Sequence, residues 1–180
     1  TSPTLDHLLI KNCNVTSNGG GIYATHSANP AISFVTIVNN VAASNGGAIH
    51  VYDNSAPTII NSVIWNNTPT AIAAAASFSY SNVEGKGNVG TNIDADPLFL
   101  DAGNGDYHLS WANFPTQDAT RSPSIDTGDP NSPNDPDASR ADQGAFFFYQ
   151  DQQVSPVWTV VPVTVDVNSG ELIEFTVIGI

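Results

Sequence analysis

The chain has 180 residues, which is enough for one domain and a smaller appendage. It contains 4 Lys and Arg against 17 Asp and Glu, so its formal net charge is −13. This acidity makes nucleic acid and anionic membrane surfaces poor partners and favours divalent cations. The sequence has no apolar run long enough to span a bilayer and no stretch that resembles a signal peptide, so we expect no membrane insertion.

A 27-residue repeat organises residues 3–67. The positions that recur are Pro3, Pro30 and Pro57, then Asn12, Asn39 and Asn66, and finally the similar segments 18–23 and 45–50. A fixed period of this length is typical of repeat architectures, in which each repeat is one structural unit stacked on the next.

Each repeat has the pattern of several short β-strands. Runs rich in β-branched and aromatic residues, such as 31–38 and 48–52, are separated by Asn, Gly, Asp and Pro. Short strands on a constant period predict one turn of a parallel β-solenoid, in which each strand pairs with its equivalent one coil away. Asn39 is then expected to stack about 4.8 Å from Asn12 and from Asn66, at bends that suit left-handed backbone.

The repeat also resembles a known family. Residues 57–67 read P-T-I-I-N-S-V-I-W-N-N and follow N-G-G-A-I at 45–49, a pattern similar to that of right-handed parallel β-helix repeat proteins of bacteria. The resemblance implies a right-handed parallel β-helix and a secreted or cell-surface location. Enzymes of the pectate-lyase type, phage tailspikes, adhesins and proteins of no known activity share this fold, so the fold alone does not give the function.

A fourth, shorter turn follows the three full repeats. Ala71-Ile72 repeats Ala48-Ile49, and Ser81-Asn82-Val83 repeats Asn61-Ser62-Val63 at a spacing of 20 residues. We therefore predict a β-helix of about four coils over residues 1–93.

The composition changes after this fourth turn. Ten of the 17 acidic residues lie between Asp94 and Asp142, where Arg121 and Arg140 are the only basic residues. Residues 96–99 (D-P-L-F), 105–109 (G-D-Y-H-L), 122–130 (S-P-S-I-D-T-G-D-P) and 140–145 (R-A-D-Q-G-A) resemble the segment that follows the β-helix in the same proteins. We expect residues 94–150, here named the acidic segment, to be rich in loops and to cap the C-terminal end of the helix.

The last part, residues 151–180, is predicted to be a linker and a β-hairpin tail. Residues 157–167 and 172–180 are strand-like and are joined by Asn168-Ser169-Gly170. Because an isolated hairpin is not stable in water, this tail is expected to lie on an apolar surface or on a neighbouring molecule. The complete fold prediction is therefore an all-β chain with a short β-helix, an acidic cap and a β-strand tail.

The acidic segment is the best candidate for a site, because Ca²⁺ binds carboxylate, amide and carbonyl oxygens. The candidate ligands lie in two loops, Asp101, Asn104 and Asp106 in the first and Asp129, Asn131, Asp135 and Asp137 in the second. A structural Ca²⁺ is therefore one interpretation. The alternative is that these side chains form Asx turns and caps, with Asp126, Asp142 and Arg140 in a structural network.

Signals of catalysis are weaker. A lyase of this fold needs a Lys or Arg base, and Lys11 and Lys86 lie in turn-like contexts. A glycoside hydrolase needs two carboxylates in one cleft, yet Asp6 and Asp53 are 47 positions apart, which is no multiple of the period. His26 and His50 could be neighbours one coil apart, but a metal pair is the weaker interpretation.

Other side chains allow carbohydrate binding or packing. The aromatic candidates for contact with sugar rings are Trp65, Trp111, Trp158, Tyr23 and Tyr52. Trp65 lies within a strand pattern and is expected to pack, and Tyr23 and Tyr52 are expected side by side on the outer surface. Cys13 is the single cysteine, so no disulfide within the chain is expected, and its place in a coil suggests a buried structural thiol.

Together these features predict a non-enzymatic extracellular module with a structural or adhesive role. A sharper hypothesis is self-assembly, in which the C-terminal strands of one copy join the β-helix of the next into a filament or surface layer. The expected partners are the protein itself or a surface polysaccharide. The alternative is a domain that binds or degrades carbohydrate, as a lyase or a hydrolase.

Overall fold

The computed structural model describes residues 2–69, 71–73 and 76–150. The chain divides into two units, residues 1–150 and 151–180. The predicted hairpin tail falls wholly within the second unit and lies outside the described residues. In the described part of the chain, no helix has the length and apolar character needed to cross a membrane.

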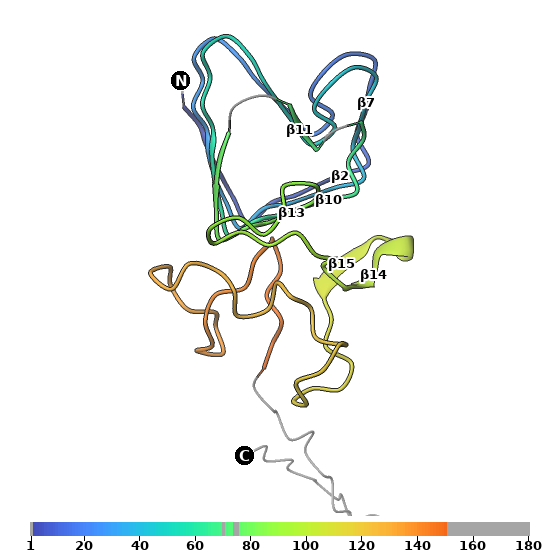
Figure 1. Ribbon diagram of the computed structural model, residues 1–180, viewed down its shortest axis with the longest axis vertical. Helices are drawn as coiled ribbons and strands as arrows, with labels where there is room; N and C mark the ends of the chain where they lie inside the picture. Colours follow the sequence, from blue (N-terminus) through green and yellow to red (C-terminus); the bar gives the residue numbers. More distant parts are fainter. Residues whose placement is uncertain (1, 70, 74–75, 151–180) are drawn as a thin grey trace, which may run out of the picture. The chain divides into compact units, whose positions relative to one another are not determined.

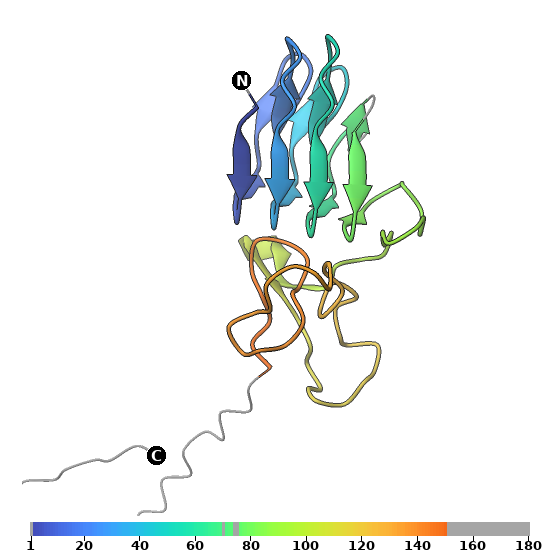
Figure 2. The ribbon, with the colours of Figure 1, turned by 90° about the vertical axis from the view of Figure 1, so that its left-hand side faces the viewer.

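Residues 2–93 form stacked coils of short parallel strands (Figures 1 and 2). The first sheet contains β1 (Thr4–Asp6), β5 (Ala31–Ser33), β9 (Thr58–Ile60) and β12 (Ser77–Ser79). The second contains β2 (Leu9–Lys11), β6 (Thr36–Val38), β10 (Val63–Trp65) and β13 (Asn82–Val83). The third contains β4 (Ile22–Ala24), β8 (Ile49–Val51) and β11 (Ile72–Ala73), and β3 (Asn14–Val15) pairs with β7 (Val41–Ala42).

The 27-residue period sets the register between the first three coils. Ile10 pairs with Ile37, and Ile37 pairs with Ile64, so identical side chains stack from coil to coil. The prediction of an all-β fold with about four coils of parallel β-helix is confirmed. The fourth coil is shorter: Val63 pairs with Asn82 at a spacing of 19 residues, so the predicted spacing of 20 is wrong, and Ile49 pairs with Ile72 at a spacing of 23.

The interior of the coils is aliphatic. Ile32, Ile37, Ile49, Ile59 and Ile64 are all fully buried, because alternate strand residues point inward and stack on their equivalents. Their counterparts in the first coil, Leu5, Ile10 and Ile22, are only partly buried because they have a neighbouring coil on one side.

The bends between strands repeat as well as the strands. Asn12, Asn39 and Asn66 have φ of 57°, 55° and 53°, and Asn66 Nδ2 donates to Asn39 Oδ1 at 2.6 Å. The predicted stack of asparagines at left-handed bends is therefore confirmed. A second column of bends has φ of 50° at His7, Phe34 and Asn61.

The acidic segment has little regular structure. A two-stranded antiparallel sheet joins β14 (Phe99–Asp101) to β15 (Asp106–Leu109), with a 3₁₀ turn η1 (Ala102–Asn104) between them. Leu109, Trp111 and Ile125 form a small second core, against which Phe99, Phe114 and Phe148 pack. Turns held by side chains account for most of the remaining residues.

The acidic segment lies along the flank of the coils (Figure 2). Lys11 Nζ in the first coil donates to Gly105 O at 3.1 Å, and Ala145 N donates to Thr36 Oγ1 in the second coil at 2.9 Å. In the later coils, Gly144 N donates to Asn61 O and Asn82 Nδ2 donates to Ala95 O, both at 2.8 Å.

The acidic segment was expected to cap the C-terminal end of the β-helix, whereas most of it lies elsewhere. At the last coil, Asn82 binds the segment through the backbone of Ala95 and through Ser124 Oγ. The rest lies along the side, because polar groups of the outer bends, such as the side chain of Asn61, offer it hydrogen bonds there.

Candidate functional site

In the first predicted calcium loop, the carboxylates are engaged in local turns. Asp101 accepts hydrogen bonds from Asn104 N at 3.3 Å and from Asn104 Nδ2 at 2.7 Å, which caps η1. Asp106 accepts from His108 N at 3.0 Å and contacts His108 Nδ1 at 2.6 Å. These hydrogen bonds to His108 lower the pKa of Asp106.

The second predicted loop is built in the same way. Asp129 Oδ1 accepts from Asn131 N and Nδ2, at 2.9 and 3.0 Å. Asp137 Oδ1 accepts from Ser139 N and Oγ, while its Oδ2 accepts from Gln150 N. Asp135 Oδ2 accepts from Asp142 N at 3.0 Å. Asx turns therefore account for Asp129 and Asp137, whereas Asp135 joins two segments of the loop.

The described residues contain no group of three or more His, Cys, Asp or Glu side chains placed to hold a metal ion. The seven predicted ligands each have a local partner, and this geometry favours the turn interpretation over a ready-made calcium cage. Structural Ca²⁺ stays a prediction from the sequence.

The most unusual electrostatics surround Asp142, which is 2% exposed. Its Oδ1 accepts from Asp126 N at 2.7 Å and its Oδ2 accepts from Phe148 N at 2.6 Å. Burial raises the pKa of Asp142 to about 7, although the two backbone donors act in the opposite direction. Burial also raises the pKa of Asp135 to about 6.

The predicted network of Asp126, Asp142 and Arg140 is therefore present in a modified form. Asp126 forms its ion pair with Arg121, at 2.8 Å, and Gln150 Nε2 donates to its other oxygen. Arg140 instead donates from Nε to Gly128 O at 2.7 Å, and its Nη2 reaches the same carbonyl. The sequence could not distinguish the two arginines, because both lie in family-like motifs.

A pocket of about 360 Å³ lies where the acidic segment meets the first two coils. Its aromatic walls come from His7 and Phe34 at the bends of coils one and two, and from Phe147. The opposite wall is the loop 133–136, and Asp135 and Asp142 also line the pocket. Two carboxyl groups with raised pKa values thus share one concave site with aromatic rings, and no motif in the sequence indicated this pocket.

The aromatic candidates of the β-helix are arranged in a stack. Tyr23 pairs in register with His50, their ring centroids are 5.1 Å apart, and His50 is 6.5 Å from Tyr52. His50 thus lies between the two tyrosines that were expected side by side. Its ring partner in the preceding coil is Tyr23, whereas the sequence suggested His26. Tyr23 and Tyr52 are nevertheless 47% and 63% exposed, so both rings remain accessible to solvent.

The tryptophans have structural surroundings. Trp111 is 5% exposed, donates from Nε1 to Thr116 O and has Arg121 over its ring at 4.8 Å. Trp65 is partly buried on β10, in agreement with the predicted packing role. Trp158 lies outside the described residues.

The candidate basic and acidic residues for catalysis lie apart. Lys11 binds Gly105 O and lies 5.3 Å from the centre of the Tyr107 ring, so it ties the acidic segment to coil one. Asp6 is on β1 and accepts from Ser33 Oγ, which lowers its pKa, whereas Asp53 follows β8 in another sheet.

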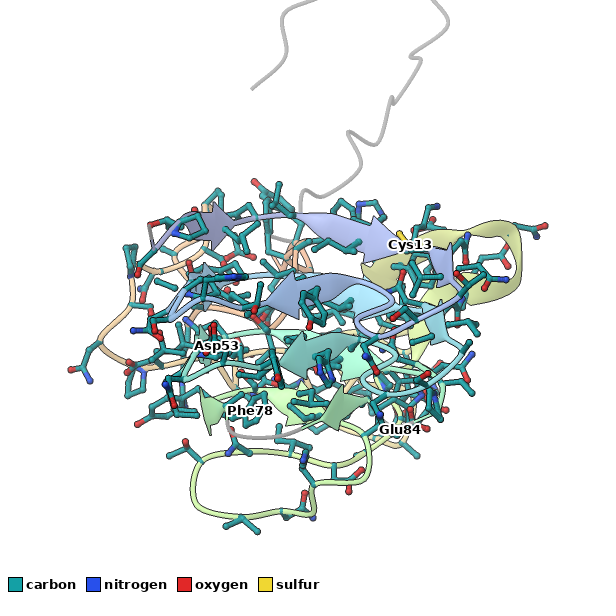
Figure 3. All side chains as sticks on the ribbon, turned by 90° about the horizontal axis from the view of Figure 1, so that it is seen from above. Cys13, Asp53, Phe78 and Glu84 are labelled. Carbon is teal, nitrogen blue, oxygen red and sulfur yellow. The ribbon has the colours of Figure 1, made fainter. Side chains whose placement is uncertain are left out.

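The expected burial of Cys13 is wrong, because its side chain is exposed at the outer edge of the first coil. Figure 3 shows Cys13 and Glu84 at opposite ends of the stack. In the next two coils the equivalent positions are Asn40 and Asn67, which form a buried ladder: Asn40 Nδ2 donates to Asn67 Oδ1 at 3.0 Å. This ladder was not predicted, although Asn40 and Asn67 have the 27-residue spacing of the repeat.

Comparison with known proteins agrees with this architecture. Residues 5–93 match the family model described as right handed beta helix region. The match covers the coils and stops where the acidic segment begins. No curated protein and no solved structure matches the chain. From the parallel sheets, the 27-residue register and this match, we conclude that residues 5–93 form a right-handed β-helix of the kind that this family model describes.

Proposed function

We propose that the chain is a non-enzymatic structural or adhesive module that works outside the cell, on the cell surface or in secreted form. The observation that carries this proposal is that the acidic segment forms hydrogen bonds with all four coils, an arrangement here named the clamp. Bonds from Lys11, Thr36, Asn61 and Asn82 join four successive coils to one segment. Such cross-links suit a module that must keep its shape under load.

The charged side chains that were candidates for a metal site or for catalysis support the same proposal. Asp101, Asp129 and Asp137 hold turns, and Lys11 and Arg140 bind backbone carbonyls. Each hydrogen bond of this kind contributes about 1 kcal/mol to stability. A protein that uses its charged groups in this manner gains rigidity from them.

We further propose that Ca²⁺ binding and self-association serve this structural role. The parallel sheets of the coils support association, since a strand of another copy can extend such a sheet by the same backbone pairing that joins one coil to the next. Another copy or a surface polysaccharide is the proposed partner. The proposed contribution of the C-terminal strands concerns residues outside the described ones.

The structural proposal is tested by two measurements, the cleavage of polysaccharides and the mass of the particles that the protein forms. The protein is incubated with soluble pectin, alginate and xylan, and new reducing or unsaturated ends are measured over hours. In parallel, light scattering gives the particle mass with and without EGTA. We expect no new ends and a particle mass above that of one chain. Catalytic turnover of any of the three polymers would overturn the proposal.

A second candidate function, carbohydrate binding, is favoured by a polar hollow at the end of the stack. This hollow of about 350 Å³ is lined by Asn66, Asn67 and Thr68, together with Glu84 and Lys86. Carboxylate, ammonium and amide groups are suitable partners for sugar hydroxyls. Lys86→Ala is expected to weaken retention on a polysaccharide affinity gel, whereas unchanged retention would exclude this hollow.

A further inference from the structure

The pocket between the coils and the acidic segment is walled by rings and prolines. His7 and Phe34 stack with centroids 4.7 Å apart and planes 15° apart, so the two bends present one continuous aromatic edge. Phe147, Pro133 and Pro136 close the other sides. This arrangement gives an apolar enclosure of a size that accepts a small organic molecule.

The polar part of the pocket is formed by the carboxyl groups of Asp135 and Asp142. Asp135 is partly exposed at the pocket, and its described hydrogen bond, from Asp142 N, involves Oδ2. Asp126 and Asp137 repel its charge, and His7 is the neighbouring group that attracts it. A cation that enters the pocket would offset this repulsion, while an apolar skeleton attached to it would pack against the rings.

We propose that this pocket binds an organic cation, an ammonium group carried on a small apolar skeleton, with Asp135 as its counter-ion and Phe34 and His7 as its aromatic wall. Charge complementarity supports this occupant, since the chain has a net charge of −13. A metal ion fits less well. Both oxygens of Asp142 already accept backbone hydrogen bonds, and Ca²⁺ requires six to eight oxygen ligands.

The test uses choline and its neutral isostere 3,3-dimethyl-1-butanol, titrated into the whole chain by calorimetry and by ligand-observed NMR. We expect saturable binding of choline and about tenfold weaker binding of the isostere, because it lacks the charge. This binding is independent of the proposed structural role, so the experiment succeeds or fails separately from it.

Two variants examine the pocket directly. Asp135→Asn keeps an oxygen that can accept from Asp142 N, and Phe34→Asn places at the bend the residue that the next coil has there as Asn61. Each is expected to weaken choline binding about tenfold with little change in melting temperature. The matched control Asp53→Asn removes one charge from an exposed bend whose φ of 51° suits Asn.

The binding results distinguish a pocket for an organic cation from a metal site and from apolar binding alone. Loss of choline binding in both pocket variants, with binding retained in Asp53→Asn, would support the proposal. Equal binding of choline and its isostere would overturn it, as would a choline affinity unchanged by Asp135→Asn. Saturable binding of CaCl₂ that depends on Asp135, in the absence of choline binding, would also overturn it in favour of a metal site.

Discussion

At the scale of single residues, buried amides hold the coils together. Asn40 is fully buried, and its side chain serves three coils at once: Oδ1 accepts from Cys13 N, and Nδ2 donates to Ile10 O and to Asn67 Oδ1. Ser62 and Ser81 form a similar column, in which Ser62 N donates to Ser81 Oγ at 3.1 Å. A buried polar group is tolerable only with such partners, because an unsatisfied one costs about 1–3 kcal/mol.

Replacement of Asn40 by Ala should therefore be strongly destabilising. The change leaves Cys13 N and Ile10 O without the side chain that they bind. We expect a loss of about 2–4 kcal/mol in the free energy of unfolding, measured with urea. Asn45→Ala is the control, because Asn45 forms an equivalent ladder bond to Asn18 at an exposed position, and its loss should cost less than about 1 kcal/mol. Equal effects of the two changes would contradict the role of burial.

The raised pKa values of Asp135 and Asp142 make stability depend on pH. In the folded chain these carboxyl groups keep their protons to about pH 6 and about pH 7, whereas their ordinary pKa is 3.8. Between about pH 4 and pH 7 the folded state thus binds more protons than the unfolded state. Its free energy of unfolding should therefore fall as pH rises through this interval.

Urea unfolding at about pH 5 and about pH 7.5 measures this dependence. The hydrogen-bonded carboxyl groups with lowered pKa, such as Asp6 and Asp137, act below about pH 4 and in the opposite direction, so they do not mask the effect. Asp135→Asn removes one titrating group and should make the fall shallower. Stability that rises over the same interval would show that the carboxylate forms are favoured in the fold.

At the scale of the element, the close stacking of the bends restricts side-chain size. A Cβ built on Gly47 would lie 2.4 Å from the backbone N and O of Thr68 in the next coil. The neighbouring backbone cannot move without breaking the sheet register. This explains why the sequence repeats Gly at 20 and 47 at this bend.

Gly47→Ala is accordingly expected to lower the free energy of unfolding by about 3 kcal/mol or more, or to prevent folding. Gly103→Ala serves as its control, because a Cβ there would have its nearest contact, with Asp101 Oδ1, at 3.8 Å. Thermal melting followed by circular dichroism compares the two. A Gly47→Ala protein as stable as Gly103→Ala would mean that adjacent coils are less tightly stacked than described.

Asn61 is the bend residue that joins the coils to the acidic segment. Its Oδ1 accepts from Asp129 N at 2.6 Å and its Nδ2 donates to Ser132 Oγ at 2.8 Å. Asn61→Gly keeps the left-handed bend and removes both bonds, so we expect a loss of about 1–3 kcal/mol. Asn54→Gly is the matched control at an exposed bend with φ of 57°. If the two variants unfold at the same urea concentration, the clamp contributes nothing measurable.

At the scale of the whole molecule, the coils were predictable from sequence and the placement of the acidic segment was not. The period alone aligned Ile10 with Ile37 and Asn39 with Asn66, because every coil repeats the same contacts. The acidic segment makes single, long-range contacts, such as Ala145 N to Thr36 Oγ1 across 109 positions. No periodic signal accompanies a contact of this kind.

The candidate sites also depend on contacts that no periodic signal in the sequence reveals. Oxygen-rich loops at 101–106 and 129–137 suggested calcium, but the sequence does not say whether a carboxylate faces an ion or its own turn. The pocket was missed because its walls come from His7, Phe34 and Phe147, which are distant in the chain. Only the folded arrangement brings the two bends next to the loop 133–136.

The central claim is that the acidic segment is an integral flank of the β-helix and stiffens it. Two single-tryptophan variants test it most directly, one retaining Trp65 in the coils and the other retaining Trp111 in the second core. Urea unfolding followed by the fluorescence of each tryptophan should give one shared midpoint and slope, since a cooperative unit unfolds in a single transition. A Trp111 transition at lower urea than that of Trp65 would contradict the claim, because the segment would then detach from coils that stay folded.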